Sequence, residues 1–223
     1  MDSISGGVHE LCSVIARHHA QNTFRLRLLH RHITIPEGQI MLGTSMTGPT
    51  GFWTKPTPIA EVDLGNIHPH IVSVDSNYKT SEGERSILLP SEFREGPPAN
   101  IGCIESEFYE DFTDCLWRTG LQAVFGLEIV QEQLGKMIEF SFDIGSLLLE
   151  DKQVKEDVKD QKNGFFQLQE TSWTITIKDG VVCKTGETRC VTYTTGHIKF
   201  TDSKAKGFLD VVRVLADEDI LIT

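Results

Sequence analysis

The sequence lacks any long apolar run and all of the common enzyme signature motifs. Without such a run, no segment is suited to crossing a bilayer as a helix. There is no G-x-S-x-G, P-loop, G-x-G-x-x-G or H-E-x-x-H motif, so lipase, NTPase, Rossmann and zincin classes have no support. The N-terminus has neither a basic start nor an apolar stretch, so we expect no signal peptide or anchor and a cytoplasmic location.

Paired cysteines and basic residues are also scarce. The 5 cysteines are odd in number and contain no C-x-x-C pair, which disfavours a disulfide framework or a zinc knuckle and indicates buried thiols. Lysine and arginine total 21 against 32 aspartates and glutamates, and the resulting net charge of -11 repels a phosphate backbone. We therefore expect a small-molecule substrate and no nucleic-acid or membrane partner. The sequence does not indicate the oligomeric state.

What the chain does have is the composition of a globular protein. Its 223 residues are 39% hydrophobic and 24% charged. We expect a single domain spanning residues 1–223, because single β-rich domains often reach this length. The segment 151–163 has mixed charge and no aromatic residue, so we expect a mobile charged loop or a frayed helix there.

Hydrophobic periodicity predicts an α+β fold. Apolar residues recur at helical spacing in 8–20 and 105–119, and 207–221 is expected to be a helix or a strand pair. Alternation with a period of two predicts strands in 24–35, 67–74, 138–144 and 172–184, and 39–45 is expected to return as a hairpin partner of the first. Short turns imply antiparallel pairing. We predict a curved antiparallel sheet, able to close into a barrel, with two or three helices packed against it.

The strand predicted at 24–35 carries the clearest chemical feature. Alternation places His30 and His32 on one face and Arg25, Arg27 and Arg31 on the other, where the arginines would meet solvent or acidic partners. Two histidines on a leucine-rich face would each need a hydrogen-bond partner if merely buried. The pair is therefore a candidate site, although a structural role stays open.

A second pair of alternate histidines, His68 and His70, flanks Pro69. Because proline is confined to strand ends and sheet edges, we expect both side chains to be solvated there.

The segment from His30 to Glu37 resembles the first metal motif of cupins, H-x-H-x4-E. The resemblance implies a divalent metal, which imidazole and carboxylate ligands suit, held by His30, His32 and Glu37 with His197 as a fourth ligand. Phe24 stands where the cupin motif has a glycine, and the second cupin motif is absent. The resemblance therefore covers only about a dozen residues.

A second resemblance covers more of the chain. The sequence is similar to a family of uncharacterised fungal proteins with an LLHRH strand motif, whose members often accompany biosynthetic genes for secondary metabolites. This resemblance implies a cyclase, isomerase or lyase that acts on a small organic substrate. The residues that carry it are Leu28-Leu29-His30-Arg31-His32, Pro90-Ser91-Glu92-Phe93, the strand around Trp173, Cys190 and Gly196-His197.

Three hypotheses follow from these features. In a metal-free acid–base enzyme, His30 or His32 is the general base and the other the acid or orienting group, because imidazole titrates near neutral pH. Glu37 or Glu92 would orient a ring, and His197 would close the site if the sheet curls around it. The alternatives are the cupin-like metalloenzyme and a noncatalytic binding or scaffold protein. The candidate substrate-binding aromatic residues are Phe52, Trp53 and Trp173.

Cys190 is a weaker candidate, as a nucleophile. A nucleophilic cysteine needs a neighbouring base and access to the substrate, so a buried structural thiol is the preferred interpretation.

Overall fold

The computed structural model describes residues 2–30, 33–74, 87–98, 101–102, 104–130, 135–159, 167–193, 196–197, 199–200 and 205–222. Twelve strands form one sheet in this part of the chain. Their bounds are β1 (Phe24–Leu28), β2 (Gln39–Thr47), β3 (Thr50–Pro58), β4 (Ile67–Val74), β5 (Leu88–Glu95), β6 (Phe125–Ile129), β7 (Met137–Phe142), β8 (Gly145–Glu150), β9 (Gln167–Lys178), β10 (Val181–Tyr193), β11 (Gly196–His197) and β12 (Lys199–Phe200).

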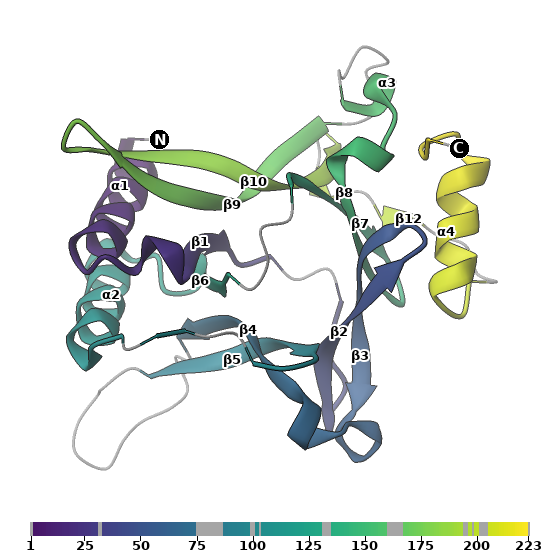
Figure 1. Cartoon of the computed structure of the whole chain (residues 1–223), viewed down its shortest axis with the longest axis horizontal. Helices are drawn as coiled ribbons and strands as arrows, with labels where there is room; N and C mark the ends of the chain where they lie inside the picture. The colour runs from purple at the N-terminus through teal and green to yellow at the C-terminus, as the bar shows by residue number, and fades with distance from the viewer. Residues whose placement is uncertain are drawn as a thin grey trace.

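Ten of these strands close into a ring at the centre of the molecule (Figure 1). The order around the ring is β10-β9-β1-β6-β4-β5-β2-β3-β8-β7, and β7 pairs back to β10. Pairing within the ring is antiparallel except between β2 and β5 and between β7 and β10. The predicted α+β class with a curved, mainly antiparallel sheet is confirmed.

The helices lie outside the ring, on opposite sides of it. The α-helices are α1 (Asp2–Arg17), α2 (Ser106–Thr119), α3 (Glu156–Lys159) and α4 (Phe208–Asp217). Helices α1 and α2 lie beside β1 and β6, and α4 lies at the far side, beside β7 and β12 (Figure 1). No helix in the described ranges is both long and apolar enough to cross a membrane.

One apolar core fills the space between α1, α2 and the ring. Phe24 and Leu26 of β1 and Leu127 of β6 are buried there against Phe108 and Phe112 of α2. The rings of Phe24 and Phe108 stack with centroids 5.3 Å apart. Helix α1 comes close to the end of α2 at Gly7, where a Cβ atom would lie 2.6 Å from Leu121 Cδ1. The expected start of this helix at residue 8 is corrected, because α1 begins at Asp2 and continues through Gly6 and Gly7.

A second apolar core lies on the other side, between the ring and α4. Ile138 and Phe140 of β7 are fully buried in it, as is Leu215 of α4. Val154 and Val158 belong to the same core. The mobile loop expected at 151–163 is corrected for residues 151–159. These residues contain a 3₁₀ turn (Asp151–Gln153) and α3, because Val154 and Val158 are buried in the core. Residues 160–163 lie outside the described ranges.

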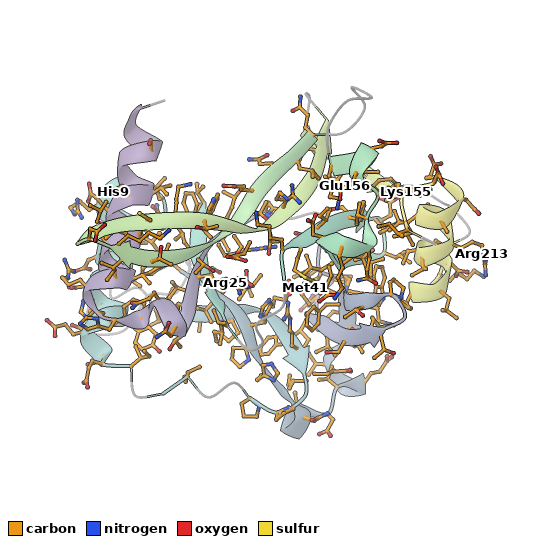
Figure 2. All side chains as sticks on the ribbon, turned by 45° about the horizontal axis from the view of Figure 1, so that its top comes forward. His9, Arg25, Met41, Lys155, Glu156 and Arg213 are labelled. Atoms are coloured by element: carbon orange, nitrogen blue, oxygen red, sulfur yellow. The ribbon has the colours of Figure 1, made fainter. Side chains whose placement is uncertain are left out.

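Charged side chains point into the ring from the strands whose apolar faces form the two cores. Successive residues of a strand point to opposite faces, so the neighbours of the core residues point into the ring. Arg25 and Arg27 alternate with Leu26, Glu128 alternates with Leu127, and Glu139 alternates with Ile138. Figure 2 shows Arg25 in the middle of the molecule, together with Met41, whereas His9 and Arg213 lie on its outer helices.

Two expectations for the first third of the chain are corrected. Strand β1 ends at Leu28 rather than Ile35, and β2 pairs with β3 and β5 rather than returning along β1. The candidate substrate-binding residues Phe52 and Trp53 lie in β3. The prolines Pro56 and Pro58 did not prevent this strand, because they lie beyond the part of β3 that pairs with β8, where an unpaired edge accommodates proline.

We expect Leu215→Ala to lower the free energy of unfolding by about 2–5 kcal/mol, because it removes a fully buried side chain between α4 and the ring. Leu209→Ala is the matched control in the same helix, since Leu209 is 72% exposed, and should change it by less than about 0.5 kcal/mol. Urea unfolding measures both. Equal effects of the two substitutions would contradict the placement of α4.

Candidate functional site

A cavity of about 730 Å³ extends into the ring. It lies between strands β4, β5 and β7 and the segment that leads from β1 to β2. Its volume falls within the range of small-molecule sites in proteins, roughly 300–1,000 Å³. The wall is divided by polarity. Arg27, His30, Glu92, Glu139 and Ser146 supply polar groups, and leucine, isoleucine, methionine and phenylalanine side chains supply the apolar part.

Arg27 is the centre of a buried charge network in the polar wall. Its Nη2 atom donates to Glu139 Oε2 at 3.0 Å, and Nη1 lies 3.8 Å from Glu128 Oε2. Glu128 also pairs with Arg25, at 3.4 Å. Burial alone would lower the pKa of Arg27, but the carboxylates of Glu139 and Glu128 outweigh it and raise that pKa. The guanidinium therefore keeps its charge inside the protein.

His30 contacts the same carboxylate as Arg27. Its Nδ1 atom lies 3.0 Å from Leu28 O, and because a carbonyl oxygen only accepts, Nδ1 is assigned as the protonated donor. Its Nε2 atom then points to Glu139 Oε2, at 3.2 Å. The prediction that arginines and histidines occupy opposite faces is therefore wrong for Arg27 and His30. Strand β1 ends at Leu28, so the alternation does not extend to residue 30.

Glu92 is a cavity group whose acidity is strongly shifted. Burial is the main cause that raises its pKa from 4.5 to about 7, although Arg94 and Arg27 oppose that shift. Its side chain retains 21% exposure and lines the cavity, so a ligand can reach it. A carboxyl group with this pKa is half protonated near neutral pH and can both donate and accept a proton.

His70 lies beside Glu92 rather than in solvent, which corrects the expectation of a solvated edge. Its Nε2 atom is 4.0 Å from Glu92 Oε1, and the residue is 3% exposed. Burial first, and then Arg94 and Arg27, lower the pKa of His70 well below its usual value, so the ring is neutral. His68 is also buried, at 4% exposure, and its Nδ1 lies 2.9 Å from Gly96 O. Both are enclosed because β4 lies between β5 and β6.

The aromatic residues predicted to bind the substrate do not line this cavity. Phe52 is inside the ring, but the guanidinium of Arg94 covers its face at 3.6 Å, and it borders a separate cavity of about 20 Å³. Trp53 packs in the core beside α4, against Phe142. Trp173 packs in the core beneath α1 and α2. Since both tryptophans point away from the ring interior, neither lines the large cavity.

The cupin-like ligand set is not assembled by the described residues. Glu37 is exposed. His32 lies outside the described ranges, and for His197 only its place in β11 is described. What the structure brings together instead is His30, Glu139 and Cys190, whose ligand-type atoms all lie within 4.8 Å of one another. This arrangement therefore does not support metal binding by His30, His32 and Glu37.

Cys190 has the environment of a structural thiol. It is fully buried, and burial together with the charge of Glu139 raises its pKa far above the usual range. A thiolate nucleophile needs the opposite shift.

Glu139 and Glu128 are the functional residues that the sequence interpretation missed. Glu139 alternates with Ile138 and Phe140, so the sequence places it on the face of the strand opposite the core, and 125–129, which carries Glu128, was not predicted as a strand. A usable signal is the match between alternating arginines on one predicted strand and a glutamate on another, because opposite charges can pair across a closed sheet.

Comparison of the chain with protein-family models, with curated proteins and with solved structures finds no significant match. The class of protein is therefore defined by the geometry itself: a closed α+β sheet with a polar interior and a cavity of ligand size.

The pKa of Glu92 predicts how stability depends on pH. Because it is about 7 in the folded protein and near 4.5 in the unfolded chain, the folded state loses stability as pH rises from about 4.5 to 7. Glu92→Gln removes this dependence, so the variant should gain up to about 3 kcal/mol on the wild type between pH 4.5 and 8. Urea unfolding across this range measures it.

The matched control is Glu95→Gln, on the same strand but exposed. Its stability should follow the wild-type pH curve. Parallel curves for Glu92→Gln and the wild type would show that the pKa of Glu92 is not raised.

Proposed function

We propose that this protein is an enzyme of the isomerase, cyclase or lyase type, which moves a proton on a small organic substrate held in the cavity. The observation that carries the proposal is Glu92, a cavity-lining carboxyl group whose pKa is raised to about 7. A proton-transfer group is most effective when its pKa is near the working pH. Groups with such shifts gather at active sites.

Arg27 gives the proposed reaction its second component. It lines the same cavity as Glu92 and keeps a positive charge there. When Glu92 takes a proton from carbon next to a carbonyl group, negative charge develops on the carbonyl oxygen. A fixed guanidinium that faces this oxygen in a low-dielectric interior lowers the energy of that state. His30, held by Leu28 O and Glu139, adds a polar group to the same wall.

The apolar part of the wall defines the rest of the substrate. Apolar side chains such as Leu29, Ile33, Ile40 and Met41 also line the cavity. They would hold a hydrocarbon portion and exclude water from the reacting atoms. The substrate we propose is an amphipathic molecule with an enolisable carbonyl group. Many secondary metabolites are compounds of this kind. A role in secondary metabolism, which the fungal resemblance implies, is therefore part of this proposal.

A noncatalytic ligand carrier is the second candidate. It is favoured by the extent of the apolar lining, which would bind a ligand without any chemistry.

Proton exchange with solvent tests the proposal without knowledge of the natural substrate. In deuterium oxide, the protein should catalyse deuterium incorporation next to the carbonyl of amphipathic ketones or aldehydes, as measured by mass spectrometry. The rate should rise with pH through about 7, because the ionised carboxylate is the base. Glu92→Gln should reduce it by roughly 100-fold or more.

Glu95→Gln is again the control and should retain the wild-type rate, since this exposed side chain lies outside the cavity. Equal rates for Glu92→Gln and the wild type would reject Glu92 as the base. Binding of the same compounds with no exchange would favour the carrier.

A further inference from the structure

Three side chains with metal-binding chemistry meet beside the cavity, and two of them, His30 and Glu139, line it. His30 follows β1, Glu139 lies in β7 and Cys190 in β10, yet their ligand-type atoms all lie within 4.8 Å of one another. His30 Nε2 and Glu139 Oε2 are 3.2 Å apart. Two ligands of one tetrahedral zinc ion, each bonded at about 2.0–2.2 Å, would be about 3.4 Å apart. This pair is therefore already near the spacing of two ligands of one ion.

The orientation of His30 is that of a metal ligand. Its Nδ1–H donates to Leu28 O, which fixes the tautomer and directs Nε2 toward the other two residues. Metal-binding histidines commonly donate their second ring N–H to a carbonyl or carboxylate in this way.

A catalytic Cys-His-Glu triad is a poorer fit to the same three residues. In a triad, one ring nitrogen contacts the thiol and the other contacts the carboxylate. Here Nδ1 is used by Leu28 O, so Nε2 alone faces both Glu139 and Cys190. The thiol is also fully buried, so a substrate cannot reach it. One metal ion bound by all three residues fits this geometry better than a proton relay through a catalytic triad does.

We propose that His30, Glu139 and Cys190 bind one divalent transition-metal ion, for which zinc is the best chemical fit. Imidazole nitrogen, carboxylate oxygen and thiolate sulfur are the ligand types of protein zinc sites. The Cys190 thiol, whose pKa is raised by burial in the metal-free protein, would release its proton as the ion binds. Arg27 contacts Glu139 and opposes a cation, but Glu128 lies 3.8 Å from the same guanidinium and offsets part of its charge. Zinc binding of this kind does not depend on the proposed function.

The position of the site indicates a use for the ion. His30 and Glu139 line the cavity that also contains Glu92, so an ion with these three ligands would have its open position toward the cavity. Catalytic zinc sites have this arrangement of three protein ligands and one open position. The ion would polarise a substrate carbonyl while Glu92 takes the proton. This use, unlike the binding itself, rests on the proposed function.

Cobalt(II) titration of the purified full-length protein tests the site. We expect one equivalent to bind, with a thiolate-to-cobalt charge-transfer band in the near ultraviolet that added zinc removes. Cys190→Ser should abolish the band, and His30→Ala should weaken zinc affinity by at least about 10–100-fold. The control is Cys183→Ser, on the same strand but partly exposed, which should bind cobalt as the wild type does.

Thermal unfolding provides a second measurement in case a variant folds poorly. Zinc should raise the Tm of the wild type and of Cys183→Ser, and should leave that of Cys190→Ser and His30→Ala unchanged, with circular dichroism as the check on folding. Failure of the wild type to bind cobalt, or a band that persists in Cys190→Ser, would overturn the proposal. Glu92→Gln should still bind the metal, so loss of exchange activity in that variant tests the proposed function separately.

Discussion

The ion pairs of Arg27 are the interaction on which the rest of the structure depends. Arg27 contacts Glu128 of the neighbouring strand β6 and Glu139 of β7, which is separated from β1 in the ring by β9 and β10. A buried charge is costly unless it is paired and hydrogen-bonded. Removing any one of the three would deprive a buried charge of one of its partners. Arg27, Glu128 and Glu139 thus stabilise one another's charges inside the ring.

This polar interior explains where the apolar cores lie. Since one face of β1, β6 and β7 carries charges, the other face carries the residues that drive folding, and helices cover that face on both sides of the ring. Helices and apolar cores therefore cover two sides of the ring, and the charged groups of the interior lie beside a cavity. Burial shifts the acidity of Glu92 and His70 in opposite directions.

Local patterns in the sequence predict much of the secondary structure but not the inside of the ring. The alternation in 138–144 and the Asp179-Gly180 turn correctly predicted β7 and the β9–β10 hairpin. The His30 strand was correctly singled out, but period-two alternation cannot show that β1 ends at Leu28, so the face of His30 was assigned wrongly. Whether the polar face of a strand meets water or another strand depends on closure of the sheet, which is a long-range property. Glu139 was therefore found only in the three-dimensional structure, and Cys190, considered from the sequence as a nucleophile, was not predicted to lie beside His30.

The coupling between Arg27 and Glu139 tests this account most directly. A double-mutant cycle with Arg27→Met and Glu139→Gln, in metal-free buffer, gives their interaction from urea unfolding. Because the pair is buried at 3.0 Å, we expect a coupling of about 1.5–3 kcal/mol, with the double variant less destabilised than the sum of the single variants. The exposed pair Arg118–Glu10 should show no measurable coupling. Additive effects of Arg27→Met and Glu139→Gln would contradict a closed sheet organised around this charge pair.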